Sequence, residues 1–221
     1  MEVRTEYDKK LNEVQSQLIG MGKLVTEALE KSIKALETKN AEVAETVVNG
    51  DKTIDEMQIT IEDKTLELIA LQQPIAKDLR ILSTALKMTT DLERIGDHAK
   101  KIAKIAMKLS GEELIKPLID IPKAAKLSAD MVGKVLVAYV HMDLKLAMEV
   151  IAMDEKVDGI CRQCKQDILA YMLDNPQNIP QGTELNKIVH RLERIGDHAT
   201  NLAEWIGYLI TGKRIQKLEE D

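Results

Sequence analysis

The chain has 221 residues and a formal net charge of −6, with 44% hydrophobic and 31% charged residues. This length allows one large core or two smaller halves, and the negative charge argues against a nucleic-acid partner, which would need a basic face. Aromatic residues make up 2% and Phe is absent. The core must therefore consist of aliphatic side chains and Met, which suits packing between helices better than a sheet.

No apolar run reaches the roughly 18 residues that a membrane-spanning helix needs, so we expect no direct membrane insertion. The first residues, Met1 to Glu6, lack the apolar region of a signal peptide. The two cysteines, close together in one predicted helix, form no disulfide framework. Together these features predict a cytoplasmic protein.

The first part of the chain shows helical periodicity, with apolar residues spaced by threes and fours. Gly20 and Gly22 interrupt this pattern at a place where we expect another helix to approach closely. Asn40 is suited to cap the following helix. Three long helices joined by short links predict an antiparallel three-helix bundle. The expected helices cover residues 2–38, 40–71 and 74–109.

The second part of the chain repeats this organisation after a linker without periodicity, which contains Pro117. Asp143 takes the capping role of Asn40, and the loop at 174–180 is longer than its counterpart near Pro74. We therefore predict an all-α fold of two tandem, pseudo-symmetric, antiparallel three-helix bundles with six long helices. The expected helices of the second half cover residues 122–140, 143–173 and 183–211. The expected division is 1–111 for the first bundle, 112–121 for the linker and 122–221 for the second bundle.

An octapeptide occurs twice without change, at Leu92–Ala99 and at Leu192–Ala199. An identical sequence at a spacing of 100 residues indicates a duplicated unit. Each copy contains two carboxylates at positions i and i+4, which lie on one face of a helix. In the first copy, Glu93 and Asp97 continue an apolar stripe, so the stripe turns acidic within one helix. Buried carboxylates without a counter-ion are costly, and this pattern therefore indicates a cation.

A second set of carboxylate pairs appears at an offset of 103 residues. Asp51 and Asp55 align with Asp154 and Asp158, and each pair lies in the middle predicted helix of its bundle. Each bundle thus has two acidic pairs on neighbouring antiparallel helices. Four carboxylates near one point repel each other unless they hold metal, and oxygen ligands suit Mg, Ca, Mn or Fe.

These pairs, the octapeptide and the segment Gln73–Arg80 resemble the PhoU family over essentially the whole chain. The resemblance implies a multinuclear site of divalent or trivalent ions in each bundle, with Fe, Mn, Mg or Zn as the metal. It also implies a cytoplasmic, non-enzymatic, negative regulator of phosphate uptake and of the phosphate-starvation response. The implied partners are the ATPase of the phosphate ABC transporter, a sensor histidine kinase and a second copy of the chain in a homodimer.

The metal ligands that the resemblance implies are the repeated carboxylates and one amide. They are Asp51, Asp55, Glu93 and Asp97 in the first half, and Asp154, Asp158, Glu193, Asp197 and Asn201 in the second. The first half has Lys101 where the second has Asn201, so we expect the first site to hold metal less firmly. Glu62 aligns with Lys165, so any ligand role for Glu62 is confined to the first half.

Other candidate residues have less specific patterns. Cys161 and Cys164 form a C-x-x-C pair without a second pair for zinc, and packing in the core is the favoured interpretation. The helical pattern places His98 and His198 opposite the apolar arc, facing solvent or pairing with Arg and Glu of adjacent helices. Arg94 and the aligned Arg194 either orient the acidic pairs or are solvated, and the sequence leaves this open.

Two other functions compete with the metal-binding regulator. A di-iron carboxylate enzyme would carry His three residues after Glu. Here the nearest His follows Glu93 by five residues and lies on a different face. A metal-free helical adaptor, whose acidic pairs meet lysines, is the other alternative.

Overall fold

The structure, a computed structural model, describes residues 2–72 and 74–215, and these residues form helices without any strand. Gln73, where the segment Gln73–Arg80 begins, lies outside the described residues. The predicted all-α fold is confirmed. The helices are α1 (Glu2–Thr38), α2 (Ala41–Gln72), α3 (Ala76–Leu109), α4 (Asp120–His141), α5 (Leu144–Asp174), the short 3₁₀ helix η1 (Pro176–Asn178) and α6 (Ile179–Thr211).

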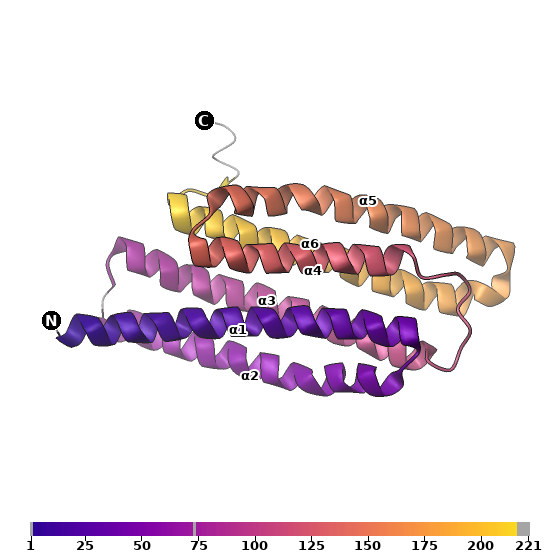
Figure 1. Ribbon diagram of the computed structural model, residues 1–221, viewed down its shortest axis with the longest axis horizontal. Helices are drawn as coiled ribbons and strands as arrows, with labels where there is room; N and C mark the ends of the chain where they lie inside the picture. Colours follow the sequence, from indigo (N-terminus) through magenta and orange to yellow (C-terminus); the bar gives the residue numbers. More distant parts are fainter. Residues whose placement is uncertain (1, 73, 216–221) are drawn as a thin grey trace.

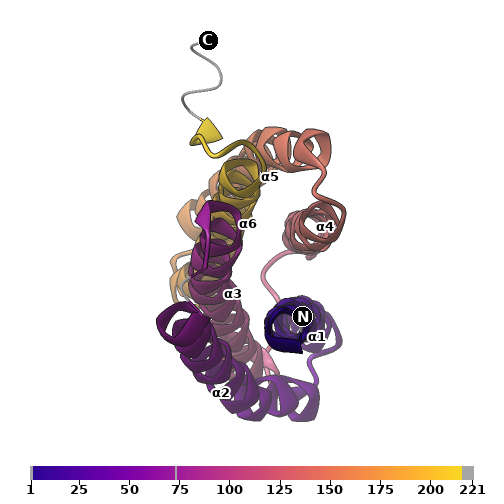
Figure 2. The ribbon, with the colours of Figure 1, turned by 90° about the vertical axis from the view of Figure 1, so that its left-hand side faces the viewer.

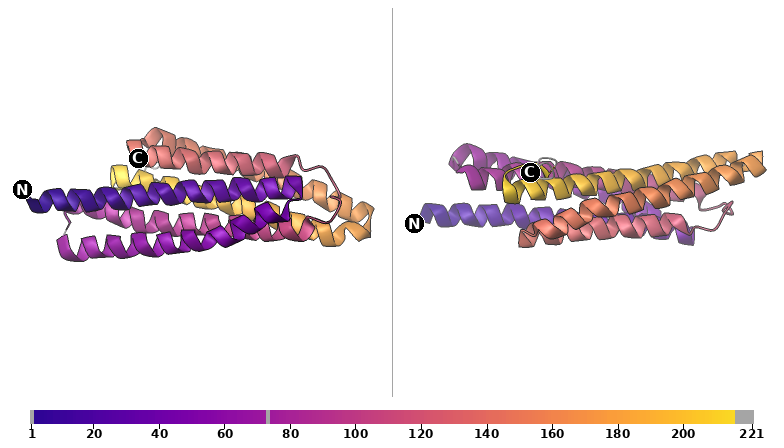
Figure 3. Two further views of the ribbon diagram at one scale, coloured as in Figure 1. Left: turned by 60° about the horizontal axis from the view of Figure 1, so that its bottom comes forward. Right: turned by 90° about the horizontal axis from the view of Figure 1, so that it is seen from above.

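The helices run along one long axis as two tandem bundles, α1–α3 and α4–α6 (Figures 1 and 3). Seen along that axis, α2, α3, α6 and α5 form a curved layer, and α1 and α4 lie side by side on its concave side (Figure 2). The bundles therefore meet through two contacts, α3 with α6 and α1 with α4. The two helices that carry the octapeptides thus lie next to each other at the centre of the layer.

The first turn of each bundle has the same geometry in both halves. Lys39 and Met142, which align at the offset of 103, both have left-handed backbones, with φ of 51° and 50°. The next residue caps the following helix in each case. Asn40 Oδ1 accepts a hydrogen bond from Val43 N at 3.1 Å, and Asp143 Oδ1 accepts one from Leu146 N at 3.0 Å. The predicted caps are confirmed.

Aliphatic side chains and Met fill the core, as the composition predicts. Gly22 allows the close contact between the bundles, since a Cβ at this position would lie 2.5 Å from Leu136 Cδ2 of α4. The predicted close approach of another helix is therefore confirmed for Gly22.

The connection between the bundles lies between α3 and α4, two residues earlier than predicted, because Pro122 falls in the first turn of α4, where proline is tolerated. Gln181 of α6 holds this connection. Its Oε1 accepts a hydrogen bond from Ile115 N at 2.6 Å, and its Nε2 donates to Glu112 Oε2 at 2.9 Å. Because Gln181 is 8% exposed, these bonds are largely shielded from water.

The loop before α6 is shorter than predicted, because α6 begins at Ile179, one turn before the expected start at Thr183. Asn175 Oδ1 accepts a hydrogen bond from Gln177 N at 3.1 Å and so starts the turn η1. Pro180 then lies in the first turn of α6, where its missing N–H has no consequence.

Candidate functional site

The first carboxylate set lies between α2 and α3. Asp51 of α2 is 4% exposed, and its Oδ2 forms an ion pair with Lys100 of α3. Its Oδ1 is buried and has no hydrogen-bond partner among the described residues. On α3 itself, Lys101 pairs with Asp97. Two lysines thus pair with carboxylates of this set, but Oδ1 of Asp51, the most buried of them, has no hydrogen-bond partner among the described residues.

The other two carboxylates of this set are electrostatically strained. Burial raises the pKa of Asp55, and the neighbouring Asp51 raises it further against the opposing effect of Lys100. Burial also raises the pKa of Glu93, with contributions from Asp97 and Asp55 that Arg94 partly offsets. These shifts mean that the carboxylates of α2 and α3 are close enough to repel each other.

The second set lies between α5 and α6. Burial raises the pKa of Asp154 to about 6, and the charges of Asp158 and Asp197 add to the shift. Burial likewise raises the pKa of Asp158, with Glu193 and Asp197 contributing. Lys165 of α5 contacts both carboxylate oxygens of Glu193 at 2.6 Å. The second set therefore also pairs with a lysine. The sequence suggested a lysine at the first set only, because Asn201 aligns with Lys101.

The glycine of the octapeptide brings α5 close to the second set. A Cβ on Gly196 would lie 2.7 Å from Asp154 Oδ1, so a side chain at this position would push the carboxylate away from α6. In the first half, a Cβ on Gly96 would instead lie 3.1 Å from Ile54 Cδ1. The same glycine thus makes room for a ligand candidate in one half and for the core in the other.

The donor chemistry of both sets suits a metal ion, but the observed arrangement is closed by basic side chains. Within the described ranges, no group of three or more Asp, Glu, His or Cys residues is arranged so that it could hold a metal ion. Hard oxygen donors, mutual repulsion and the free Oδ1 of Asp51 fit a divalent cation. Binding would require the carboxylates to exchange Lys100, Lys101 and Lys165 for the ion.

The two histidines of the octapeptides do not face solvent, which was the first of the two positions that the sequence left open. His98 is 7% exposed, and its ring lies 5.6 Å from that of His198, measured between centroids. His198 Nδ1 lies 2.8 Å from Asp91 Oδ1. The solvent-facing interpretation was wrong because α6 packs on the face of α3 opposite its own bundle, and one repeat alone does not reveal that contact. The alternative, pairing with a residue of an adjacent helix, holds for His198, although its partner is an Asp and not a Glu.

Asn201, the ninth predicted ligand, is directed toward the first half. Its Nδ2 donates a hydrogen bond to Asp91 Oδ1 of α3 at 3.2 Å, whereas the second set is completed by carboxylates of α5. Ligation of a metal by Asn201 would require this bond to break. The sequence comparison also missed Lys100, which contacts Asp51 and is replaced by Thr200 in the second half. The difference between Lys100 and Thr200, directly after two identical octapeptides, was the feature of the sequence that could have indicated this contact.

The arginines and cysteines have simpler roles. Arg94 Nε lies 3.5 Å from Glu93 Oε2, and Arg194 Nη1 lies 2.8 Å from Asp197 Oδ2, so both arginines pair with the carboxylates of the octapeptides.

Cys161 is a buried free thiol whose pKa is raised to about 12 by burial and by Glu193. Cys164 is also buried and free, and burial raises its pKa to about 11. The favoured interpretation of both as core residues is supported, and Cys161 borders the second set.

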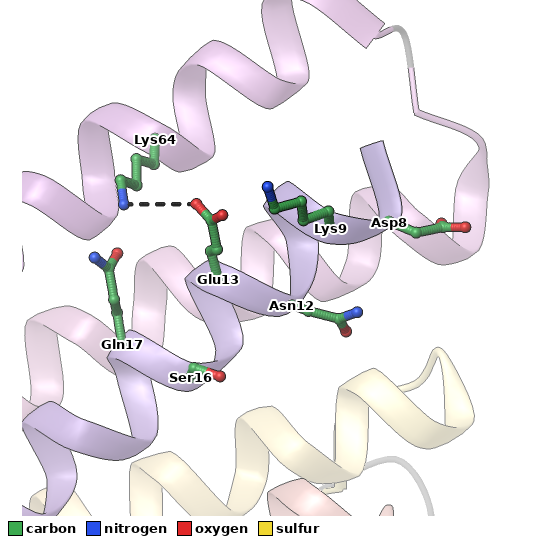
Figure 4. Close-up of a pocket in the computed structure, with 7 residues that line it drawn as sticks. All are labelled: Asp8, Lys9, Asn12, Glu13, Ser16, Gln17 and Lys64. Atoms are coloured by element: carbon green, nitrogen blue, oxygen red, sulfur yellow. Dashed lines mark ion pairs between the residues drawn. The ribbon is translucent and has the colours of Figure 1, made fainter. Parts of the chain in front are cut away.

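A hollow of about 650 Å³ lies beside the polar face of α1, away from the carboxylate sets (Figure 4). Asn12, Glu13 and Ser16 of α1 are among its lining residues, as is Lys64 of α2, whose Nζ lies 4.0 Å from Glu13 Oε2. It contains none of the repeated carboxylates, so the duplicated sets remain the candidate site.

Comparisons with known proteins agree with the duplication. A family model described as PhoU domain matches residues 18–106 and again residues 121–206. The phosphate-specific transport system accessory protein PhoU homolog of Aquifex aeolicus is 38% identical over 186 residues, 84% of each chain. The homolog of the same name from Clostridium acetobutylicum is 38% identical over 216 residues, 96% of this chain and 97% of that one.

Solved structures are similar over nearly the whole length. The crystal structure of PhoU from Pseudomonas aeruginosa matches with a TM-score of 0.91 and 32% identity, covering 94% of this chain and 100% of that chain. The phosphate transport system regulatory protein PhoU from Streptococcus pneumoniae matches with a TM-score of 0.88 and 33% identity, covering 95% and 99%. None of the helices in the described ranges combines the length and apolar composition that a membrane span requires.

Proposed function

Because the chain belongs to the PhoU family, we propose that it is a metal-binding regulator of phosphate uptake that acts in the cytoplasm beside the phosphate transporter. It restrains the phosphate-starvation response by coupling the transporter ATPase to a sensor histidine kinase, and it works as a homodimer. The names of its relatives, which describe an accessory protein of the phosphate-specific transport system, support the first part of this proposal.

The observation that supports metal binding is the buried Oδ1 of Asp51, which has no hydrogen-bond partner among the residues that the structure describes. An unpaired carboxylate oxygen beside Asp55 and Asp97 is destabilising unless a cation comes to it. Asp51, Asp55, Glu93 and Asp97 of the first half, and Asp154, Asp158, Glu193 and Asp197 of the second, would hold such a cation, which would supply the positive charge that these carboxylates need. The role is therefore structural and regulatory, without a reaction at the metal.

The metal-free adaptor is the second candidate, and the ion pairs favour it. Lys100, Lys101 and Lys165 already neutralise one carboxylate each. In that case the two carboxylate sets would connect neighbouring helices through lysines alone. The partners of the protein would be the same, but its activity would not depend on metal.

The two candidates differ in metal content and in what chelation does. Protein purified without chelator should contain bound metal, and the double variant Asp51→Asn, Asp154→Asn should lose it while keeping its helical circular dichroism. Affinity capture from phosphate-replete cells, with crosslinking, should recover the transporter ATPase and the histidine kinase, and light scattering should give the mass of a dimer. If neither the parent protein nor the double variant contains metal, the metal-free adaptor is the correct function. If neither the transporter ATPase nor the histidine kinase is captured, the regulatory role is contradicted.

A further inference from the structure

Basic side chains surround the outer part of the second carboxylate set. A hollow of about 420 Å³ there is lined by three carboxylates and four basic residues from α5 and α6. The carboxylates are Asp158, Glu193 and Asp197, and the basic residues are Arg162, Lys165, His190 and Arg194. We refer to these four basic residues as the basic rim.

The basic rim is paired with the carboxylates as the structure stands. Lys165 holds both oxygens of Glu193, and His190 Nδ1 lies 3.5 Å from one of them. Arg194 pairs with Asp197 at 2.8 Å, and the charge of Arg162 opposes the raised pKa of Asp158. Three carboxylates therefore balance three permanent positive charges, and His190 lies against one of the carboxylates.

The basic side chains retain the freedom to change partners. The side chains of Lys165, His190 and Arg194 are 40%, 56% and 50% exposed, so each can turn from a carboxylate to another group at the mouth of the hollow. Exposed ion pairs of this kind contribute little stability, so the basic side chains can exchange partners readily.

The first half lacks a comparable basic rim at the aligned positions. Arg162 aligns with Ile59, Lys165 with Glu62 and His190 with Thr90, so that among the four positions only Arg94 is basic. Ile59 is 57% exposed, so this position faces the solvent in the first half as well. The basic rim is thus a property of the second half alone.

We infer that the second carboxylate set, once it holds a divalent cation, binds a phosphate oxyanion through the basic rim. This inference rests on the metal binding proposed above and names a ligand for that site. When Asp158, Glu193 and Asp197 turn to the cation, Lys165, His190 and Arg194 lose their partners. The hollow then carries excess positive charge, and a tetrahedral oxyanion is the natural counter-ion for converging lysine and arginine side chains.

Cation and phosphate should therefore help each other to bind. Because binding free energies are reciprocal, a phosphate that binds more tightly in the presence of metal must also tighten the metal. In the first half, Glu62 stands where the second has Lys165, so phosphate would meet a carboxylate instead of a lysine. The coupling should accordingly be confined to the second set.

The test is titration calorimetry of the full chain with inorganic phosphate, with and without a saturating Mg²⁺ concentration. We expect one phosphate per chain with Mg²⁺ and at least about tenfold weaker binding without it. The rim variant Arg162→Ile, Lys165→Gln, His190→Thr should bind Mg²⁺ in the same stoichiometry and phosphate at least about tenfold more weakly, a loss of about 1.4 kcal/mol. The control variant Lys123→Gln, Lys126→Gln, Lys145→Gln, which removes exposed bases outside the hollow, should bind phosphate as the parent does.

A reciprocal variant tests sufficiency. Ile59→Arg, Glu62→Lys should add a second phosphate per chain by giving the first half part of the basic rim. Glycerol 3-phosphate, titrated in parallel, distinguishes the source of the ligand. If glycerol 3-phosphate competes with inorganic phosphate, the site accepts a phosphate group carried by an organic molecule. If it does not compete, the site accepts free phosphate alone.

Three outcomes would overturn the inference. If Mg²⁺ binds but phosphate does not, the basic rim has no anion and the proposed metal site still stands. If the rim variant binds phosphate as well as the parent, the anion binds elsewhere. If neither Mg²⁺ nor Mn²⁺ binds to the parent, then metal binding itself is wrong and the inference fails with it.

Discussion

Asp91 of the first half contacts His198 of the second, with 2.8 Å between Asp91 Oδ1 and His198 Nδ1. The residue that aligns with Asp91 is Arg191. Burial lowers the pKa of His98 to about 4, and the charges of His198 and Arg191 contribute to the shift. The two copies of one histidine therefore occupy opposite environments. His198 has a carboxylate partner, and His98 is held neutral near the centre of the molecule.

The stability of the chain should depend on pH through His98. The unfolded chain binds a proton at His98 as the pH falls below about 6.5, whereas the folded chain does not until about pH 4. The free energy of unfolding should therefore fall across this window, by about 2 kcal/mol between pH 7 and pH 4.5. Urea denaturation of the parent and of His98→Gln checks this. The variant should lose less stability over the same range, and equal losses would contradict the assignment.

The charge on Asp154 should destabilise the metal-free chain at neutral pH. Its pKa is about 6 in the folded chain and near 3.8 in the unfolded chain. The contribution of Asp154 to the free energy of unfolding is therefore fully present below pH 3.8 and is lost as the pH rises through 6. Asp154→Asn should raise the thermal midpoint at pH 7.5 in chelator by about 2–4 °C, equivalent to about 1 kcal/mol. Asp130→Asn, at an exposed position on α4, is the control and should change little. An unchanged midpoint for Asp154→Asn would mean that its carboxylate is better solvated than the structure indicates.

The second set should hold metal more firmly than the first in buffer that contains phosphate. Lys100 and Lys101 both compete with a cation at the first set, whereas the basic rim of the second can turn to the anion. Asp158→Asn should therefore cost more bound metal than Asp55→Asn, together with more of the thermal stability that chelator removes. Metal analysis and thermal unfolding with and without chelator measure both quantities. Equal losses would show that the lysines of the first set do not compete.

The octapeptide glycines should respond differently to the same substitution. Gly196→Ala places a methyl group against Asp154 Oδ1 and should weaken metal binding at the second set several-fold. Gly96→Ala meets the flexible end of Ile54 instead, and should leave metal binding intact while stability changes by about 1 kcal/mol or less, because alanine also favours the helix. Metal titration followed by circular dichroism separates the two effects. Equal metal affinity in both variants would refute the role of Gly196.

Periodicity and repeated residues were sufficient to predict six helices, their caps at Asn40 and Asp143, and the close contact at Gly22. These features depend on local spacing or on one residue type, so they are visible in a single sequence. The start of α6 was predicted one turn late because Asn175 nucleates a turn that replaces part of the expected loop. The two carboxylate sets were identified correctly as neighbours across helix pairs, as the pKa shifts of Asp55 and Asp158 indicate.

The contact between the bundles could not be predicted from one repeat. The burial of His98 depends on which face of α3 the second bundle covers, and the helical pattern of α3 alone assigns that face to solvent. The pairing of Lys100 with Asp51 depends on the register of two antiparallel helices. Long flexible side chains reach partners several residues away, so spacing along the chain does not determine which lysine meets which carboxylate.

The segment between α3 and α4, which Gln181 holds in place, joins the two repeats covalently in one chain. In a symmetric dimer of identical subunits, a residue favourable beside one histidine must also occur beside the other. Covalent fusion removes that constraint, so that Asp91 and Arg191 could diverge, as could Glu62 and Lys165. The two halves can therefore surround the same octapeptide with different charges while they keep one fold.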